Sequence, residues 1–342
     1  RSSSGRSRSV LSARRAPGSV ARYAWPRLYP YDAAAAGAML RTRLGETRFD
    51  ALHVERLYLA PLAGAGPAAR RSILDLDEDD GATQRAIGSL HALNGEADAA
   101  DAAVQEASKL DRLRRDFLPR FDLILLAAPG EAAALQEEFR DARIAVVANA
   151  LRASGKAPVS PASAKSIDYL MVGNFGYYPN ADGARFFCRE VLPLIRQAGG
   201  PRHVGLVGQR PGEKVRALAT LPDVAVHAGP ADLVPFYADS AVAVVPVRAG
   251  GGSRIKILEA FAQGLPVVST RIGAAGLEAA DGCHLLIADG SEDFAAAALR
   301  LRRDPALAAA LAAEGQALLE RRYGFENAVA GILSLVDSLA RI

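Results

Sequence analysis

The sequence predicts an α/β protein built from parallel sheets with helices on both faces. Two observations lead to this class. Short apolar segments alternate with alanine-rich helical segments through most of the 342 residues, which is the pattern of parallel sheets with crossover helices. Residues 241–247, Ala-Val-Ala-Val-Val-Pro-Val, contain no polar side chain. A strand of this kind is one that helices cover on both faces.

The composition indicates a globular protein with two cores. The chain is 50% hydrophobic and 23% charged, and it is long enough for two domains. The mild net charge of +3 is unevenly distributed, because seven arginines precede the first acid, Asp32. Mixed with Ser, Ala, Gly and Pro, this basic stretch predicts a poorly ordered segment at 1–48. Trp25, Tyr29 and Tyr31 lie among the arginines, but no RNA-binding motif accompanies them, so we expect no nucleic-acid partner.

The cysteines and the hydropathy bear on the cellular compartment. Two cysteines, Cys188 and Cys283, support neither a disulfide framework nor a zinc cluster, so we predict no metal and a reducing cytoplasm. No apolar run approaches the roughly 18 residues that span a bilayer, and the start lacks the apolar core of a signal peptide. The basic start leaves open a peripheral contact with the inner face of the cell membrane. The first residue is Arg, so we expect a piece of a longer reading frame or a processed product.

The first half contains few strands. Apolar segments predict strands at 51–54, 72–76, 123–127 and 144–147, with a long polar helical region at 83–115. Residues 152–166 carry glycine, prolines and small polar residues without periodicity, which indicates a linker. We therefore predict a partial N-terminal domain at 49–151.

The second half predicts a complete doubly wound domain at 167–342. Strands are expected at 168–172, 203–207, 224–227, 241–247, 266–269 and 284–287. Helices are expected at 181–197, 212–218, 232–238, 254–263, 292–303, 305–321 and 326–339. In such sheets ligands bind beyond the carboxyl ends of the strands.

Four of these strand ends carry glycine. They are Gly173 with Asn174, Gly208 with Gln209, Ala228 with Gly229, and residues 250–252, three consecutive glycines that we call the glycine loop. Together they predict a polar ligand lying close to the backbone. The alternative is that glycine is common in strand-to-helix turns.

The glycine loop leads into a helix with a distinctive polar face. Ser253 is a good N-cap, and Arg254 opens the helix. Free N–H groups and the helix dipole favour an anion at such a start, and Arg254 and Lys256 add positive charge. At about 100° per residue, Lys256, Glu259 and Gln263 share a narrow polar face, while Ile255 falls on the apolar arc. Glu259 then needs hydrogen-bond donors, which a ribose diol would supply.

The glycine loop has a purely structural interpretation as well, and two catalytic motifs can be excluded there. Lys256 and Glu259 could be an i,i+3 surface pair on an ordinary amphipathic helix after a long turn. The sequence contains no P-loop, and residues 251–255 lack the final glycine of a nucleophile elbow.

Several segments resemble a known family. The stretches "VGNFGYYPNADGARFFCREVLPLI", "GLVGQRP", "DLVPFYADSAVAVVPVRAGGGSRIKILEAFAQGLPVVSTRIGAAGLE" and "HLLIADG" resemble, in order and spacing, the C-terminal half of a family 4 glycosyltransferase of the GT-B fold. Upstream, "SILDLDEDD" and "FDLILLAAPGE" resemble the latter part of that family's N-terminal domain. The resemblance implies two Rossmann-like domains facing a cleft, with the N-terminal one incomplete and the terminal helix returning to it.

The resemblance also implies a reaction. It is the retaining transfer of a sugar from a nucleotide diphosphate sugar to a polysaccharide or lipid-linked acceptor, with no cofactor. Cations and amides would stabilise the departing diphosphate. Glu259 matches the family glutamate that binds the ribose. Arg254 and Lys256 lie where basic groups meet the diphosphate, together with the N–H groups of Gly251, Gly252 and Ser253. Residues 226–229 match the turn that borders the base.

Three departures from the family pattern matter. Gly251 stands where the family often carries a glutamate. His53 is the histidine of the N-terminal domain, which could orient the sugar or shuttle a proton, or be structural. Nothing in residues 1–48 resembles the family's first strand and glycine-rich loop. Two alternatives therefore stay open, a non-catalytic nucleotide-binding remnant and a nucleotide-sugar 2-epimerase. The base, the sugar and the oligomeric state are not predicted.

Two groups of acids receive structural interpretations. One acidic stretch predicts a loop before a helix; it consists of Asp75, Asp77, Glu78, Asp79 and Asp80. An EF-hand is not expected, because it needs glycine at its sixth position, and a loop that starts at Asp75 or at Asp77 has none there. Asp182 predicts a helix cap or dipole partner.

Overall fold

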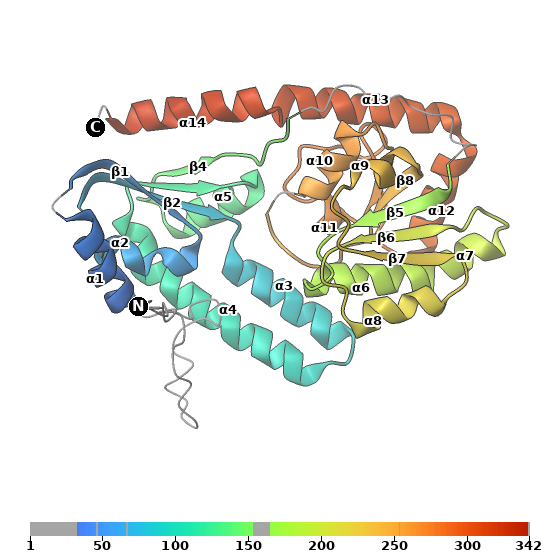
Figure 1. The fold of residues 1–342 in the computed structure, drawn as a ribbon, viewed down its shortest axis with the longest axis horizontal. Coiled ribbons are helices and arrows are strands. Elements are labelled where there is room, and N and C mark those ends of the chain that lie inside the picture. Colours follow the sequence, from blue (N-terminus) through green and yellow to red (C-terminus); the bar gives the residue numbers. More distant parts are fainter. Residues whose placement is uncertain (1–32, 46, 66–67, 153–164, 253, 341–342) are drawn as a thin grey trace, which may run out of the picture.

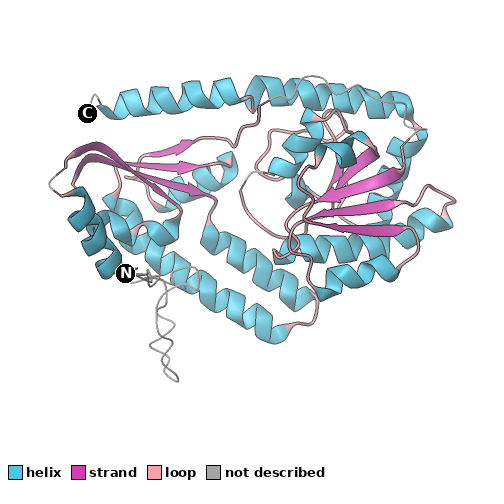
Figure 2. Ribbon diagram, viewed as in Figure 1, coloured by secondary structure: helices cyan, strands magenta, loops and turns pink. Residues whose placement is uncertain are grey.

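The computed structural model describes residues 33–45, 47–65, 68–152, 165–252 and 254–340 (Figure 1). Two parallel sheets lie side by side, and helices pack around each of them (Figure 2). The predicted α/β class is confirmed. Ser253 and residues 153–164 of the predicted linker lie outside the described residues.

The N-terminal sheet has four parallel strands in sequential order. All four strands that the sequence predicts are present. The strands are β1 Phe49–Glu55, β2 Ala69–Asp77, β3 Leu123–Leu126 and β4 Ile144–Val146. Their core is aliphatic, and Leu74, Ile124 and Leu110 are fully buried.

The helices of the N-terminal domain revise two expectations. Residues 33–44 form helix α1 although we expected poor order up to residue 48, because the run Ala-Ala-Ala-Ala has high helix propensity. The helical region at 83–115 is two helices joined by a turn at Gly95, whose φ is +74°. The helices are α1 Ala33–Leu44, α2 Pro61–Ala65, α3 Asp80–Leu93, α4 Ala97–Phe117 and α5 Pro129–Glu138.

The acidic stretch before α3 acts as a helix start. The carboxylate of Asp79 accepts hydrogen bonds from the N–H groups of Gly81 and Ala82, at 3.0 and 3.1 Å. This is N-cap geometry, so the prediction of an acidic loop feeding a helix is confirmed.

The C-terminal sheet has six parallel strands in the order β10-β9-β8-β5-β6-β7. All six predicted strands are present. They are β5 Ile167–Val172, β6 Val204–Gly208, β7 Val224–Ala228, β8 Ser240–Val245, β9 Val267–Ser269 and β10 Leu286–Ile287. The order is that of a doubly wound dinucleotide-binding sheet, whose switch point lies between β5 and β8. The loops after these two strands are the predicted strand end at Gly173 and Asn174, which continues to residue 176 as the 173–176 loop, and the glycine loop.

Helices cover both faces of this sheet. The predicted helix at 181–197 is one continuous helical run from α6 to α7 with a π-helical turn at Phe187–Val191. The helices are α6 Tyr178–Phe186, α7 Leu192–Gln197, α8 Glu213–Arg216, α9 Val234–Ala238, α10 Ile255–Ala262, α11 Arg271–Ala274, α12 Ser291–Arg303, α13 Pro305–Arg322 and α14 Phe325–Ala340.

The terminal helix returns to the N-terminal domain, as the resemblance implied. Leu335 and Leu339 of α14 pack against Ile73 and Leu125 of the N-terminal sheet, and Arg71 donates a hydrogen bond to the carbonyl of Leu339 at 3.1 Å. Figure 1 shows α13 and α14 running across both domains. Among the described helices, none combines the length and the apolar character that crossing a bilayer requires.

Helix α10 carries the predicted polar face and is anchored by its apolar face. Leu258 and Phe261 are fully buried, whereas Ile255 is 43% exposed, so the expectation that Ile255 joins the apolar arc was wrong. The helix begins at Ile255, with Arg254 at the N-cap, and its first residue therefore projects beyond the packed surface. Gly315 of α13 leaves room for the Phe261 ring, because a Cβ there would lie 2.5 Å from a ring carbon.

This packing predicts opposite effects for two glycine substitutions. Gly315→Ala should lower the free energy of unfolding by about 1–3 kcal/mol, because the added methyl group overpacks the Phe261 contact. Gly331→Ala in α14 meets no atom within 4 Å, and it should raise stability by about 0.5–1 kcal/mol through helix propensity. Chemical denaturation followed by circular dichroism compares the midpoints. Equal midpoints for the two variants would contradict the packing argument.

Candidate active site

The predicted glycine-bearing strand ends lie together at the carboxyl edge of the C-terminal sheet. Phe175 N–H donates to Gln209 O at 2.8 Å, and Gly229 N–H donates to Gly208 O at 2.7 Å. Gly208 has a φ of +153°, and a Cβ there would overlap the carbonyl of Gly173, so only glycine fits. Backbone hydrogen bonds thus join the ends of β5, β6 and β7, bringing Gly173, Asn174, Gly208, Gln209, Ala228 and Gly229 to one edge.

Lys256 lies beside the first of these strand ends. Its Nζ donates to Asn180 Oδ1 at 2.6 Å, and a Cβ at Gly173 would lie 3.2 Å from the same Nζ. Asn180 in turn donates from Nδ2 to Asn174 O at 2.9 Å, which fixes the orientation of its amide. Burial, and then the positive charge of Arg254, lower the pKa of Lys256 to about 7. A lysine with a pKa near 7 is only partly protonated at neutral pH, and a bound anion would favour its protonated form.

Glu259 lies one turn further along the same helix. Its Oε2 accepts a hydrogen bond from the hydroxyl of Tyr237 in α9 at 3.1 Å. Burial raises the pKa of Glu259, while the Tyr237 hydrogen bond and the Lys256 charge oppose that shift. Glu259 is partly buried, and a carboxylate can accept hydrogen bonds at both of its oxygens.

Arg254 braces the glycine loop from within. Its guanidinium donates to the carbonyls of Gly251 at 2.6 Å, Gly250 at 2.8 Å and Ile272 at 3.2 Å. The side chain is buried at 8% exposure, and burial lowers its pKa. In this arrangement Arg254 holds the carbonyls of Gly250 and Gly251. Its predicted direct contact with a diphosphate stays a prediction.

The N-terminal domain reaches the glycine loop with acidic side chains. Glu131, in the first turn of α5, accepts the Gly252 N–H at Oε1 over 2.7 Å. Oxygens of Glu78 and Glu131 lie 2.9 Å from where a Cβ of Gly251 would stand, and Thr83 is closer still. The absence of a side chain at position 251 therefore permits this close approach between the domains.

Arg56 gathers the acids on the N-terminal side. It donates to Asp77 and Glu78 at 3.1 Å each and to Asp80 at 2.6 Å. Arg56 and Asp77 both have positive φ, +74° and +62°, which is costly for residues with a Cβ. Burial raises the pKa of Asp80 to about 7 against the opposing charge of Arg56. The arginine thus holds Glu78 toward the glycine loop.

His53 lies elsewhere on the N-terminal sheet. Its Nε2 is 3.5 Å from Asp75 Oδ2 on the neighbouring strand, and its side chain is 53% exposed. The hydrogen bond to Asp75 raises the pKa of His53. The residues that the structure brings to Gly251 are Glu78, Thr83 and Glu131 rather than His53, so a role for His53 in the reaction stays a prediction.

A second contact joins the domains at the tip of the α3–α4 hairpin. Asn94 donates to Asp182 Oδ1 at 2.7 Å and to the hydroxyl of Tyr178 at 2.8 Å. Asp182 is 2% exposed and also accepts from Arg248 at 2.8 and 2.9 Å. Asp182 is therefore a buried partner of Arg248 and of the hairpin. The prediction of a helix cap or dipole partner was wrong, because Tyr177 is the N-cap of α6 and its first turn has no acid.

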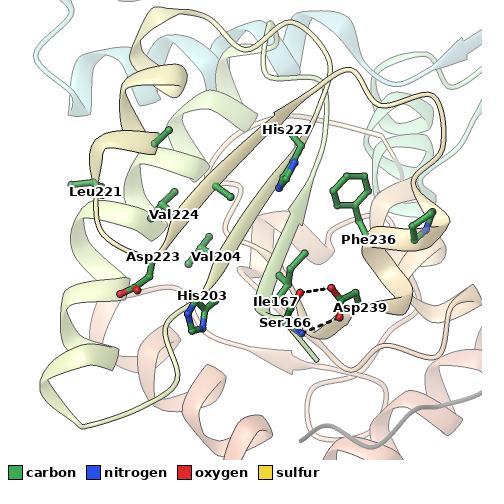
Figure 3. A pocket seen from close by; sticks show the side chains of 13 residues that line it. Ser166, Ile167, His203, Val204, Leu221, Asp223, Val224, His227, Phe236 and Asp239 are labelled. Atoms are coloured by element: carbon green, nitrogen blue, oxygen red, sulfur yellow. Dashed lines mark hydrogen bonds between the residues drawn. The ribbon is translucent and has the colours of Figure 1, made fainter. Parts of the chain in front are cut away.

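A groove of about 630 Å³ lies near the opposite edge of the C-terminal sheet (Figure 3). Its lining includes Ile167, Val204, Val224 and Phe236, together with Ser166 and Asp239, which hydrogen-bond to each other. The first three side chains start their strands, so the groove follows the amino ends. Ligands of doubly wound sheets bind at the carboxyl ends, and we give more weight to that edge, where Lys256 and Glu259 lie.

Sequence reasoning missed Glu131, Glu78 and Asn180 as site residues. Glu131 follows the end of β3, and Glu78 follows the end of β2. The rule applied to the C-terminal strands, that ligands lie beyond carboxyl ends, would have found both if applied to the N-terminal sheet. Asn180 carried no such signal, because its place depends on how the 173–176 loop folds back.

Comparisons with known proteins agree with this geometry. Residues 166–304 match the family model described as glycosyl transferases group 1. Comparison with curated proteins finds no match.

Three solved structures share the fold. Sucrose-phosphate synthase from Thermosynechococcus elongatus has 16% identity and a TM-score of 0.68, with 90% of this chain and 77% of that chain covered. TarM from S. aureus, in complex with UDP among other ligands, has 11% identity and a TM-score of 0.66, covering 87% and 58%. HepE from Anabaena, in complex with UDP and glucose, has 14% identity and a TM-score of 0.62, covering 90% and 81%.

The TM-scores of these three structures show a common fold, and this chain spans little more than half of the TarM chain. The family match covers the sheet whose carboxyl edge holds Lys256, Glu259 and the glycine loop. Residues 166–304 thus resemble group 1 glycosyl transferases, and the described chain shares the GT-B fold of these solved structures.

Proposed function

We propose that this protein is a retaining glycosyltransferase that moves a sugar from a nucleotide diphosphate sugar to a polysaccharide or lipid-linked acceptor. The donor would occupy the carboxyl edge of the C-terminal sheet. Cytoplasmic nucleotide sugars would supply it, and an acceptor on a lipid would place the reaction at the inner face of the membrane. No metal is required in this scheme, because amides and cations of the chain would face the diphosphate.

The observation that carries the proposal is the placement of Lys256 and Glu259. The two side chains lie one turn apart on α10, beside the switch point of the sheet. Lys256 adjoins the backbone of Gly173, and Glu259 is held by Tyr237. A nucleoside diphosphate has the matching chemistry, since its phosphates supply the anion and its ribose supplies two hydroxyl donors.

The chemistry follows from charge. Cleavage of the anomeric bond leaves negative charge on the departing diphosphate. Lys256 would carry its proton in that state, and the loop N–H groups would donate to phosphate oxygens. Retention of configuration requires attack from the face that the leaving group vacates, and we assign no protein nucleophile.

The role of Glu259 is tested by combining the variant Glu259→Ala with a nucleotide that lacks the ribose 2′-hydroxyl. UDP is the first probe because HepE and TarM were solved with it, and GDP and ADP follow. Glu259→Ala should weaken binding of the preferred nucleotide about 10–100-fold, the size of hydrogen bonds to a charged group. The 2′-deoxy nucleotide should bind the original protein more weakly than the ribonucleotide, while Glu259→Ala should not distinguish the two.

Calorimetric titration measures all four affinities, and Glu292→Ala, an exposed glutamate of α12, serves as the control. If the variant still prefers the ribonucleotide by the original ratio, Glu259 does not bind the ribose.

The lowered pKa of Lys256 predicts how binding depends on pH. A bound diphosphate favours the charged amine and raises the pKa of Lys256 above its free value of about 7. The complex then holds more protons than the free protein, so affinity should fall as pH rises from 7 to 9, by up to about tenfold per pH unit. This window lies above the phosphate pKa of about 6.

Titrations in two buffers of different ionisation enthalpy would measure the proton uptake directly. Lys256→Arg keeps the charge at every pH in this range, so its affinity should stay flat. A flat profile for the unaltered protein would show that Lys256 does not contact the ligand.

Turnover distinguishes the alternatives. A transferase releases the nucleotide faster when a glycan acceptor is added. A nucleotide-binding remnant would bind the nucleotide without cleaving the donor, and a 2-epimerase would release it from a 2-acetamido donor without any acceptor. Release of nucleotide from each donor, measured with and without acceptor, separates the three outcomes.

A further inference from the structure

A carboxylate of the N-terminal domain lies on the glycine loop where an anion would bind. Glu131 Oε1 accepts the N–H of Gly252 at 2.7 Å, and Oε2 accepts the N–H of Asp79 at 2.8 Å. One carboxylate therefore bridges the backbones of both domains. Gly252 belongs to the C-terminal domain, so this contact links residues 121 positions apart in the sequence.

The glycine loop is enclosed at this point. Thr83 donates to Glu78 Oε2 at 2.8 Å, and this pair and Glu131 stand against Gly251. On another side, a Cβ at Gly276 would lie 2.7 Å from Gly252 O and 3.1 Å from Ala128 of the N-terminal domain. The contact between Glu131 and the loop is thus part of a close interface between the domains.

The carboxylate takes the partner that a phosphate oxygen would take. Backbone N–H groups at a glycine turn before a helix favour anions, and a carboxylate oxygen satisfies them with a charge-assisted hydrogen bond. Burial raises the pKa of Glu131, and its two N–H partners oppose that shift. Glu131 occupies an anion site as long as no other anion displaces it.

We propose that Glu131 is a built-in competitor of the donor diphosphate, which must displace its carboxylate from Gly252 to use the full set of loop N–H groups. The inference rests on the proposed function and adds a regulation to it. The N-terminal domain then sets the donor affinity below the value that the glycine loop alone would give. A weakly binding ligand leaves Glu131 in place, whereas a diphosphate replaces the Glu131 carboxylate as the acceptor of the Gly252 N–H.

The test compares two glutamates of helix α5 in the full chain. Glu131→Ala removes the competitor, and Glu137→Ala, exposed on the same helix, is the matched control. Calorimetry at pH 8 measures binding of inorganic pyrophosphate, UDP, GDP and ADP, and of the nucleoside of the preferred base. Glu131→Ala should bind pyrophosphate and the preferred nucleotide about tenfold more tightly, the size of one charge-assisted hydrogen bond. The nucleoside affinity and the Glu137→Ala values should be unchanged.

Glu131→Gln provides a second variant of nearly the same size. Its neutral amide is a weaker acceptor than a carboxylate, so it should shift affinity in the same direction by a smaller factor. Circular dichroism establishes that each variant is folded. If Glu131→Ala and Glu131→Gln bind the diphosphates as the unaltered protein does, or more weakly, the competition is overturned while the donor site stands. If no variant binds any diphosphate, the proposed function itself fails.

Discussion

A partly buried carboxylate needs hydrogen-bond donors, and Glu131 obtains its donors from the two domains. Its position depends on the acidic loop after β2, which supplies the N–H of Asp79. The Asp79 carboxylate caps α3 and binds Arg114 of α4, which also binds Glu138 of α5 at 2.6 Å. One arginine thus ties together the three helices that carry the acidic side of the site. The glycine loop on the other side has no side chains of its own, so its place follows from these partners and from Arg254, which donates to its carbonyls.

Further contacts hold the domains in this arrangement away from the glycine loop. At the hairpin tip, Glu96 accepts from Lys214 at 2.9 Å and from Tyr178 at 2.7 Å, and these hydrogen bonds lower the pKa of Glu96 to about 2. At the other end, Leu339 of α14 is buried against the N-terminal sheet. Because contacts lie on both sides of the loop, displacing one carboxylate does not require the domains to separate. Competition at Gly252 is therefore a local event.

The sequence predicted the fold better than it predicted the site. Every strand was found, because buried parallel strands are continuous apolar runs and glycine marks their ends. Glu259 and Lys256 were found on one helix face because helical periodicity is local. Ile255 was misplaced, since periodicity does not say where packing against α13 begins. The contact of Glu131 with Gly252 joins distant segments, and no local pattern encodes such a pairing. The bracing role of Arg254 was equally hidden, because a guanidinium beside glycines suits an anion or backbone carbonyls.

The positive charges of Arg254 and Lys256 favour an anionic ligand at this site. Arg254 meets backbone carbonyls, and Lys256 meets the neutral amide of Asn180, so neither cation is paired with a carboxylate in the hydrogen bonds described. Burying an ammonium is costly, and burial, followed by the charge of Arg254, lowers the pKa of Lys256 to about 7 against the opposing charge of Glu259. A neutral ligand would leave that cost in place, whereas a diphosphate removes it by pairing with the charge. Under the proposed function, the same edge of the sheet would therefore discriminate by charge before any side chain recognises the base.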